Sequence, residues 1–188
     1  MTITTTTRVA DIGVLAKIAS KYPQSAYHGF ATSLQAEWQY LCRTTPGVGA
    51  HMGPVEDAIR NVMIPAILQL KPSEVTDDLR TLLSHGVKQG GINFRNPVED
   101  ADAVFASSEA ASGTSVASLL DGTVLEPVTH RGQVRAASVA ARKEKVTKEK
   151  AALELLKVNA PKKVIKRLKR IGQCGIWLSI PPNKLGGS

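Results

Sequence analysis

The sequence predicts a mainly α-helical protein: an irregular helical bundle with a long basic C-terminal helix pair and little or no sheet. Apolar residues recur at steps of three and four in Val9–Ser20 and in Ala26–Cys42, which is the spacing of one helix face. Residues Gln133–Val158 are rich in Ala, Lys and Glu and predict one long helix. At 188 residues and 43% hydrophobic content, the chain can bury one sizeable core.

Prolines and acidic residues mark where the first helices begin and end. Pro23 suits the first turn of the second helix, because its missing amide would be unpaired there, and Pro46-Gly47 ends that helix. Pro54 followed by Glu56 opens a third helix towards Leu70. We expect Pro65 to kink that helix or divide it in two.

The same signals predict the remaining elements. They are, in order, a fourth helix from Pro72 through Leu83, a loop or short strand over Gly86–Asn96, a helix over Val98–Ser108, a helix or mobile linker over Ser107–Ser118, and a last helix from Pro161 to about Gly172. By composition the chain divides into a disordered lead-in (1–7), a helical body (8–121), a linker (122–130), a basic helical segment (131–173) and an irregular tail (174–188).

Positive charge is concentrated late in the chain. Residues 1–130 hold 9 Lys/Arg against 13 Asp/Glu, whereas residues 131–170 hold 14 Lys/Arg against 3 Glu. A concentrated basic segment releases counterions from a polyanion, which is the main sequence-independent source of affinity for nucleic acid. We therefore expect sequence-nonspecific binding to an RNA or DNA backbone. Aromatic residues make up 4% of the chain, too few for a base-stacking platform, so we expect Tyr27, Phe30, Trp38 and Tyr40 to be core residues.

The predicted last helix, Pro161–Ile171, carries the strongest basic signal, with six cations and no acid. The predicted phosphate contacts are Arg142, Lys143, Lys145, Lys162, Lys163, Lys166, Arg167, Lys169 and Arg170. A membrane surface and a basic targeting signal are weaker interpretations of the same residues. The rival hypothesis is a protein-interaction module, in which the apolar face formed by Val164, Ile165, Leu168 and Ile171 docks into a partner's groove.

No motif in the sequence predicts catalysis. Asp77-Asp78 is followed by a helical pattern, so these acids are expected in a first helical turn rather than at a metal-binding strand turn. The four histidines lack metal-ligand spacing, and Gly86, Gly90 and Gly91 are turn glycines without the phosphate-loop spacing. We predict no enzyme activity, metal or cofactor. No apolar run reaches the roughly 18 residues of a membrane span, and two distant cysteines favour a reducing compartment, nucleus or cytoplasm.

Four blocks in order resemble the region downstream of the polymerase core in reverse transcriptases of eukaryotic non-LTR-type retrotransposons. They are Ala26-Tyr27-His28-Gly29-Phe30 continuing through Leu34, Trp38, Tyr40, Leu41, Arg43, Thr44, Pro46 and Gly47; Pro54-Val55-Glu56-Asp57-Ala58-Ile59-Arg60 with Ile64-Pro65-Ala66; Gly90-Gly91-Ile92 with Asn96-Pro97 and Ala101-Asp102; and Gly175-Ile176-Trp177-Leu178 with Pro181.

This resemblance implies a helical thumb and connection region, which in that family holds the template–primer duplex. The catalytic aspartates of the family belong to the palm, and none can be carried onto this sequence. The resemblance therefore implies a non-catalytic fragment whose partner could be the remainder of a polymerase polyprotein. A non-functional remnant of a mobile element is the further alternative.

Overall fold

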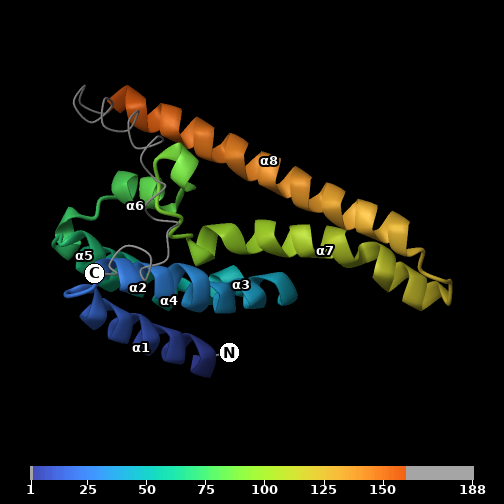
Figure 1. The fold of residues 1–188 in the computed structure, drawn as a ribbon, viewed down its shortest axis with the longest axis horizontal. Coiled ribbons are helices and arrows are strands. Elements are labelled where there is room, and N and C mark those ends of the chain that lie inside the picture. The colour runs from blue at the N-terminus through green and yellow to red at the C-terminus, as the bar shows by residue number, and fades with distance from the viewer. Residues whose placement is uncertain (1, 160–188) are drawn as a thin grey trace, which may run out of the picture.

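The computed structural model describes residues 2–159, and every regular element among them is a helix (Figure 1). The elements are α1 (Thr2–Ala19), α2 (Pro23–Gly29), the π-helical turn η1 (Phe30–Leu34), α3 (Gln35–Thr44), the 3-10 turn η2 (Val48–His51), α4 (Gly53–Ala58), the π-helical turn η3 (Ile59–Met63), α5 (Ile64–Leu68), the 3-10 turn η4 (Pro72–Glu74), α6 (Asp77–Ser84), the 3-10 turn η5 (Val87–Gln89), α7 (Pro97–Asp121) and α8 (Pro127–Asn159). The predicted mainly helical fold is confirmed.

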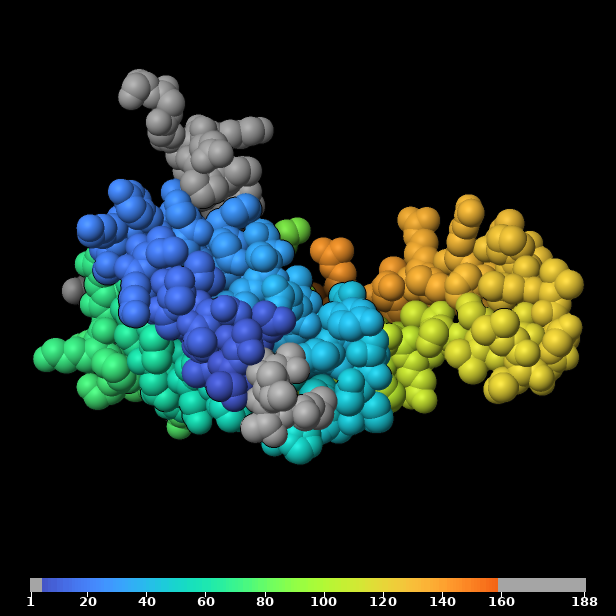
Figure 2. Space-filling view, turned by 90° about the horizontal axis from the view of Figure 1, so that it is seen from below, coloured from blue at the N-terminus to red at the C-terminus, as the bar shows by residue number. Residues whose placement is uncertain are grey.

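The helices stack in layers (Figure 1). Helix α1 packs on α2, α4 and α5; α7 lies on α3 and η2; and α8 returns antiparallel along α7, with α6 and η5 beneath its second half. We call α1 to α6 the body. The far ends of α7 and α8 extend beyond the body as a two-helix arm, which Figure 2 shows projecting to one side.

Two of the predicted helices are continuous but contain a wide π-helical turn. The second predicted helix runs from Pro23 to Thr44 through η1, with Pro23 in its first turn. The third runs from Gly53 to Leu68 through η3, and Pro65 follows directly after that wide turn. Proline has no amide to donate, so an altered hydrogen-bond pattern before it is expected. The helix is therefore not divided at Pro65; the irregularity there is the wide π-helical turn that comes just before the proline.

The core is centred on aromatic side chains from α2, η1, α3 and the loop before α7. The rings of Phe30 and Trp38 lie 5.4 Å apart, those of Phe30 and Phe94 4.4 Å apart, and Tyr27 stacks on Phe94 at 5.6 Å. The Tyr27 hydroxyl donates to the carbonyl of Ile92 at 2.9 Å. Core positions are thus confirmed for Tyr27, Phe30 and Trp38. The prediction was wrong for Tyr40, which is 65% exposed because it lies two residues beyond Trp38, on the opposite side of α3.

The segment after α6 is a loop rather than a strand. Phe94, which is fully buried, anchors it, and its amide donates to the Leu83 carbonyl at 3.0 Å. Gly90 has a positive φ of 86°, and a Cβ on Gly91 would lie 2.1 Å from the His85 carbonyl oxygen. Only glycine fits these two positions without strain, so the prediction of turn glycines there is confirmed.

Three predicted boundaries were wrong. Residues 2–7 form the start of α1 instead of a disordered lead-in, and Thr5 is buried, so packing overrides the weak helix propensity of threonine. The fourth helix begins at Asp77, capped by the Thr76 hydroxyl, after a separate turn at Pro72–Glu74. The predicted linker 122–130 is a short turn at the arm tip, because Pro127 already begins α8 and the Glu126 carboxylate accepts from the Thr129 amide at 2.6 Å.

Candidate nucleic-acid interface

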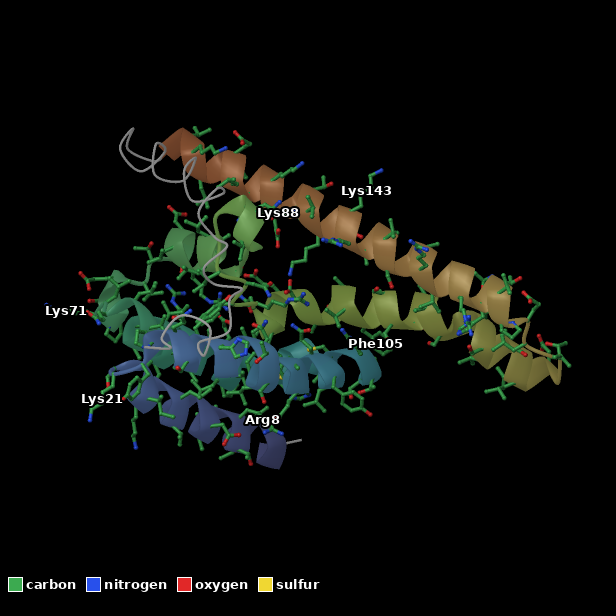
Figure 3. All side chains as sticks on the ribbon, in the orientation of Figure 1. Arg8, Lys21, Lys71, Lys88, Phe105 and Lys143 are labelled. Atoms are coloured by element: carbon green, nitrogen blue, oxygen red, sulfur yellow. The ribbon has the colours of Figure 1, made fainter. Side chains whose placement is uncertain are left out.

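The structure describes three of the nine predicted phosphate contacts, and all three lie on α8. Arg142 and Lys143 are exposed, and Lys143 points away from the body (Figure 3). The other six, Lys162, Lys163, Lys166, Arg167, Lys169 and Arg170, lie outside the described residues, as do Val164, Ile165, Leu168 and Ile171 of the rival hypothesis.

Lys145, the third of them, turns towards the body. Its Nζ lies 3.6 Å from Asp100 Oδ2 on α7 and 3.7 Å from Glu149 Oε1 one helical turn further along α8. The Glu149 side chain is buried, with 9% of it exposed, whereas that of Asp100 is 35% exposed. A phosphate would have to compete with these carboxylates. Lys145 is therefore placed to hold α8 on α7.

The buried carboxylate of Glu149 extends this cluster to α6 and the loop after it. Gly86 lies against that carboxylate, and a Cβ there would be 3.5 Å from Glu149 Oε2. The neighbouring His85 is 4% exposed. Burial lowers the pKa of His85; the negative charge of Glu149 opposes this, and the positive charge of Lys145 adds to it. Charged groups of α7 and α8 thus meet the buried His85, which follows α6, where the basic helix rests on the body.

Two further cations of α8 are paired within the helix. Lys148 lies 2.9 Å from Glu144, and Lys157 lies 2.6 Å from Glu154. Together with Lys145, these pairs engage all three acids of α8. The remaining cations of this helix have no carboxylate within ion-pair distance among residues 5–158.

The exposed cations of α8 that lack an ion pair form one set, which we call the α8 cation face. They are Arg131, Arg135, Arg142, Lys143 and Lys150. At about 100° per residue, all five lie within about 120° of one another around the helix, and they extend over about 28 Å of its length. The rest of the chain does not neutralise them, because residues 160–188 contain no Asp or Glu. Lys88 of η5 is also exposed and lies beside α8 (Figure 3).

Helix α7 has the opposite charge. It carries five acids and no Lys or Arg, whereas α8 carries eight cations and three acids. Only Asp100 of α7 forms an ion pair with α8 in the part of the chain that the structure describes. Asp102 and Glu109 are exposed on the other side of α7. The hairpin therefore has a positive side along α8 and a negative side along α7.

The other candidate sites considered from the sequence carry structural roles. Asp77 and Asp78 lie in the first turn of α6, as predicted, and Asp77 pairs with Arg60 at 2.6 Å. Burial raises the pKa of the Cys42 thiol, which favours the unreactive protonated form. Among the described residues, no three His, Cys, Asp or Glu side chains are grouped to hold a metal ion. No helix in residues 2–159 is both long and apolar enough to cross a membrane.

The sequence predicted the basic segment, but it did not predict which of its described cations lack an ion-pair partner. Arg131, Arg135 and Lys150 were not among the named contacts, and Lys88 lies far outside the basic segment. The sequence signal for Arg131 and Arg135 is their spacing of four, which continues to Arg142 at a further seven residues. No signal in the sequence places Lys88 next to α8.

Comparison with known proteins finds no matching family model, no matching curated protein and no matching solved structure. The resemblance to retrotransposon reverse transcriptases therefore stays a prediction.

Proposed function

We propose that this chain is a non-catalytic helical protein that binds the phosphate backbone of nucleic acid through helix α8. The observation that carries the proposal is the α8 cation face, five exposed cations with no carboxylate partner in the described part of the chain. Crowded, unpaired cations repel one another, and a polyanion relieves this repulsion while releasing its own counterions. Residues 162–170, which lie outside the described part of the chain, contain six further Lys and Arg residues.

The shape and composition of α8 favour backbone contact without base recognition. A duplex carries one charge per about 1.7 Å of its axis, so a cation face about 28 Å long meets several phosphates at once. Helix α8 contains no Phe, Trp or Tyr, so it offers no surface for stacking bases. Five phosphate contacts would give a slope of about −4.5 for log affinity against log salt on a DNA duplex.

A salt series of binding measurements tests the proposal on the full chain. The variant Arg131→Gln/Arg135→Gln/Arg142→Gln removes three cations of the face, and the slope should become shallower by about three units. The matched control is Lys17→Gln/Lys21→Gln/Lys71→Gln, which removes three exposed cations from the body; Lys21 and Lys71 lie at the end of the molecule far from the arm (Figure 3). This control lowers the net charge equally but should leave the slope nearly unchanged.

The same measurements distinguish local contact from a general effect of net charge. If both triple variants change the slope equally, binding follows net charge and the α8 cation face has no special part. If neither variant changes the affinity for duplex at any salt concentration, the proposal is wrong for the described cations. Charge reversal at Lys166, Arg167, Lys169 and Arg170 then tests the predicted contacts beyond residue 159. Circular dichroism of each variant checks that the helices remain folded.

The relation to reverse transcriptases is a separate proposal. A coding sequence directly upstream that specifies a strand–turn–strand aspartate pair would support it. We expect no product from the isolated chain in a primer-extension assay, and extension of a primer would contradict the assignment as non-catalytic.

A further inference from the structure

A serine hydroxyl lies within the α8 cation face. Ser138 is exposed, and at about 100° per residue its side chain points within about 60° of those of Arg131, Arg135 and Arg142 around the helix. Arg135 precedes it by three residues and Arg142 follows it by four, so each lies one turn away, with its Cβ about 5–6 Å from that of the serine. The Ser138 hydroxyl donates to the Val134 carbonyl at 2.9 Å, as serines inside helices commonly do. An accessible hydroxyl is thus surrounded by arginines.

This position fits a phosphorylated serine. Helix α8 contains no Asp or Glu before Glu144, which is paired with Lys148. A phosphate on Ser138 would carry about 1.5 to 2 negative charges at neutral pH and three acceptor oxygens. It would meet Arg135 and Arg142 through charge-assisted hydrogen bonds, and an acidic group four residues before a cation is the better orientation of such a helix pair.

The arm also gives a modifying enzyme access to this serine. A kinase binds the residues around its target in an extended form, so a serine inside a helix must first be released locally. No side chain from 102 to 148 is buried, and regions with few buried contacts open at low free energy. Arg135 lies three residues before Ser138, the position at which arginine-directed kinases select their substrates by charge. The two residues on either side of the serine are alanines and one valine, so no bulky side chain shields it.

We propose that Ser138 is a phosphorylation site and that phosphate there weakens binding of nucleic acid to the α8 cation face. A kinase removes the hydroxyl proton while the Ser138 Oγ attacks the γ-phosphorus of ATP; the bond from that phosphorus to the β–γ bridging oxygen breaks, and ADP leaves. The phosphate then occupies Arg135 and Arg142 and lowers the charge of the face from five cations to a net of about +3. This inference rests on the proposed function, since it concerns the regulation of the same site.

Phosphorylation of the full chain tests the site itself. The reagents are ATP and a purified calmodulin-dependent serine kinase, which selects arginine three residues before its target. Peptide mass spectrometry should locate phosphate on Ser138, and Arg135→Gln should slow its incorporation by about tenfold or more, because a charged hydrogen bond to the kinase is lost. The matched control Arg43→Gln, an exposed arginine of the body, should leave the rate at Ser138 unchanged. No phosphate on Ser138, or equal rates in the two arginine variants, overturns the proposal.

A salt series of duplex binding measures the effect of the phosphate. In the full chain with Ser138→phosphoserine, the slope of log affinity against log salt should be shallower by about two units, because two arginines are occupied. The affinity at 0.1 M salt should fall by about tenfold or more. The matched control Ser20→phosphoserine adds the same charge to an exposed serine of the body, next to Lys21 and far from the arm, and should change both quantities little (Figure 3). Equal effects of the two phosphates overturn the proposal.

Phosphorus NMR separates failure of this inference from failure of the proposed function. Arg135 and Arg142 should hold the second pKa of the Ser138 phosphate below its ordinary value of about 6, and Arg135→Gln/Arg142→Gln should raise it again. A phosphate pKa that this double substitution leaves unchanged overturns the contact with the arginines. If the unmodified chain binds duplex and the phosphate does not weaken it, the regulation is wrong and the proposed function stands. If the unmodified chain binds no duplex at any salt concentration, the proposed function is wrong and the regulation falls with it.

Discussion

Arg80 is the most highly connected charged residue among those described. It is buried, and its guanidinium donates to both carboxylate oxygens of Glu56 at 2.5 and 2.6 Å. It also donates to the carbonyls of Phe94 and Arg95 at 2.7 and 3.3 Å. One side chain thus joins α6 to α4 and to the loop that leads into α7. Helix α7 therefore starts from a point that this residue fixes.

Replacing Arg80 by leucine should destabilise the protein strongly. The substitution leaves the Glu56 carboxylate and two carbonyls without their donor, and breaking a buried ion pair costs about 3–5 kcal/mol. Urea denaturation followed by circular dichroism measures the free energy of unfolding. The control is Arg60→Leu, which loses an ion pair to Asp77, 87% exposed, and a hydrogen bond to the Val75 carbonyl, and it should cost only about 1–2 kcal/mol. An equal loss of unfolding free energy in the two variants would show that the contacts of Arg80 stabilise the protein no more than those of Arg60 do.

His85 should make stability sensitive to mild acid. Burial lowers its pKa in the folded state, whereas the unfolded chain takes up a proton near the ordinary value of about 6.5. The unfolded state therefore binds more protons as the pH falls below that value, so the free energy of unfolding decreases. Glu149 and Lys145 are the charged groups that act on His85 from α8.

The variant His85→Gln should lose this pH dependence. We expect the melting temperature of the wild-type protein to fall between pH 7.5 and 5.5, and that of the variant to fall by less over the same range. His51, which is exposed, provides the matched control as His51→Gln. An equal acid-induced decrease in wild type, His85→Gln and His51→Gln would contradict the role assigned to His85.

Among the elements, sequence patterns predicted the helices correctly where one local rule determined the structure of a segment. Periodic apolar residues found the helices of 9–20 and 26–42, and the effect of Pro65 follows from its missing amide. Predictions failed where packing overrode local preference. The threonines of residues 2–7 are weak helix formers, yet Thr5 is buried and the helix extends to Thr2. Contacts between residues that are far apart in the sequence leave no local pattern from which they can be predicted.

Large apolar side chains near the tip of the arm are exposed, among them Leu119 and Leu120 at 83% and 81%. Polar contacts between small side chains join its helices near the tip, namely Thr114 with Gln133 and Ser115 with His130. Gly113 adds a further weakness, because glycine in a helix interior costs about 0.5–1 kcal/mol relative to alanine. Its φ is not positive, and nothing lies within 4 Å of where its Cβ would be, so alanine fits there without strain.

The substitution Gly113→Ala should therefore raise the free energy of unfolding by up to about 1 kcal/mol. Urea denaturation at low protein concentration, where association does not contribute, measures the change. Gly91→Ala is the opposite control: its Cβ would lie 2.1 Å from the His85 carbonyl oxygen, so it should destabilise the chain. A Gly113→Ala protein less stable than the wild type would mean that the arm packs more tightly at this position than the structure indicates.

In the whole molecule, negative and positive charge lie on two neighbouring helices, α7 and α8, rather than on parts of the chain that are far apart. Composition predicted that α8 would be basic, but it could not tell which cations remain free. Lys145 is neutralised by Asp100, which lies 45 positions earlier and reaches it only through the antiparallel packing of α7 on α8. The axes of packed helices are about 8–10 Å apart, so acids on the far side of α7 lie within about two Debye lengths of α8 at 0.1 M salt and weaken its field slightly.

Removing acids from α7 should consequently strengthen binding of nucleic acid. The pairs Asp100–Lys145 and Ser115–His130 fix the register of the hairpin, which places Asp102 and Glu109 level with the stretch of α8 from Arg135 to Lys143, on the side of α7 that faces away from α8. Both acids are exposed and have no ion-pair partner among the described residues. Asp102→Asn/Glu109→Gln should raise the affinity for a duplex by up to about twofold at 0.1 M salt, and by less at higher salt.

The matched control, Asp57→Asn/Glu74→Gln, removes two exposed acids from the body instead. It changes the net charge by the same amount, but distance and screening should leave the affinity nearly constant at 0.1 M salt. A duplex titration of the three proteins over a salt series distinguishes these cases. Equal gains in the two variants would mean that binding responds to net charge alone. No gain in either would mean that bound nucleic acid does not lie along α8 beside α7.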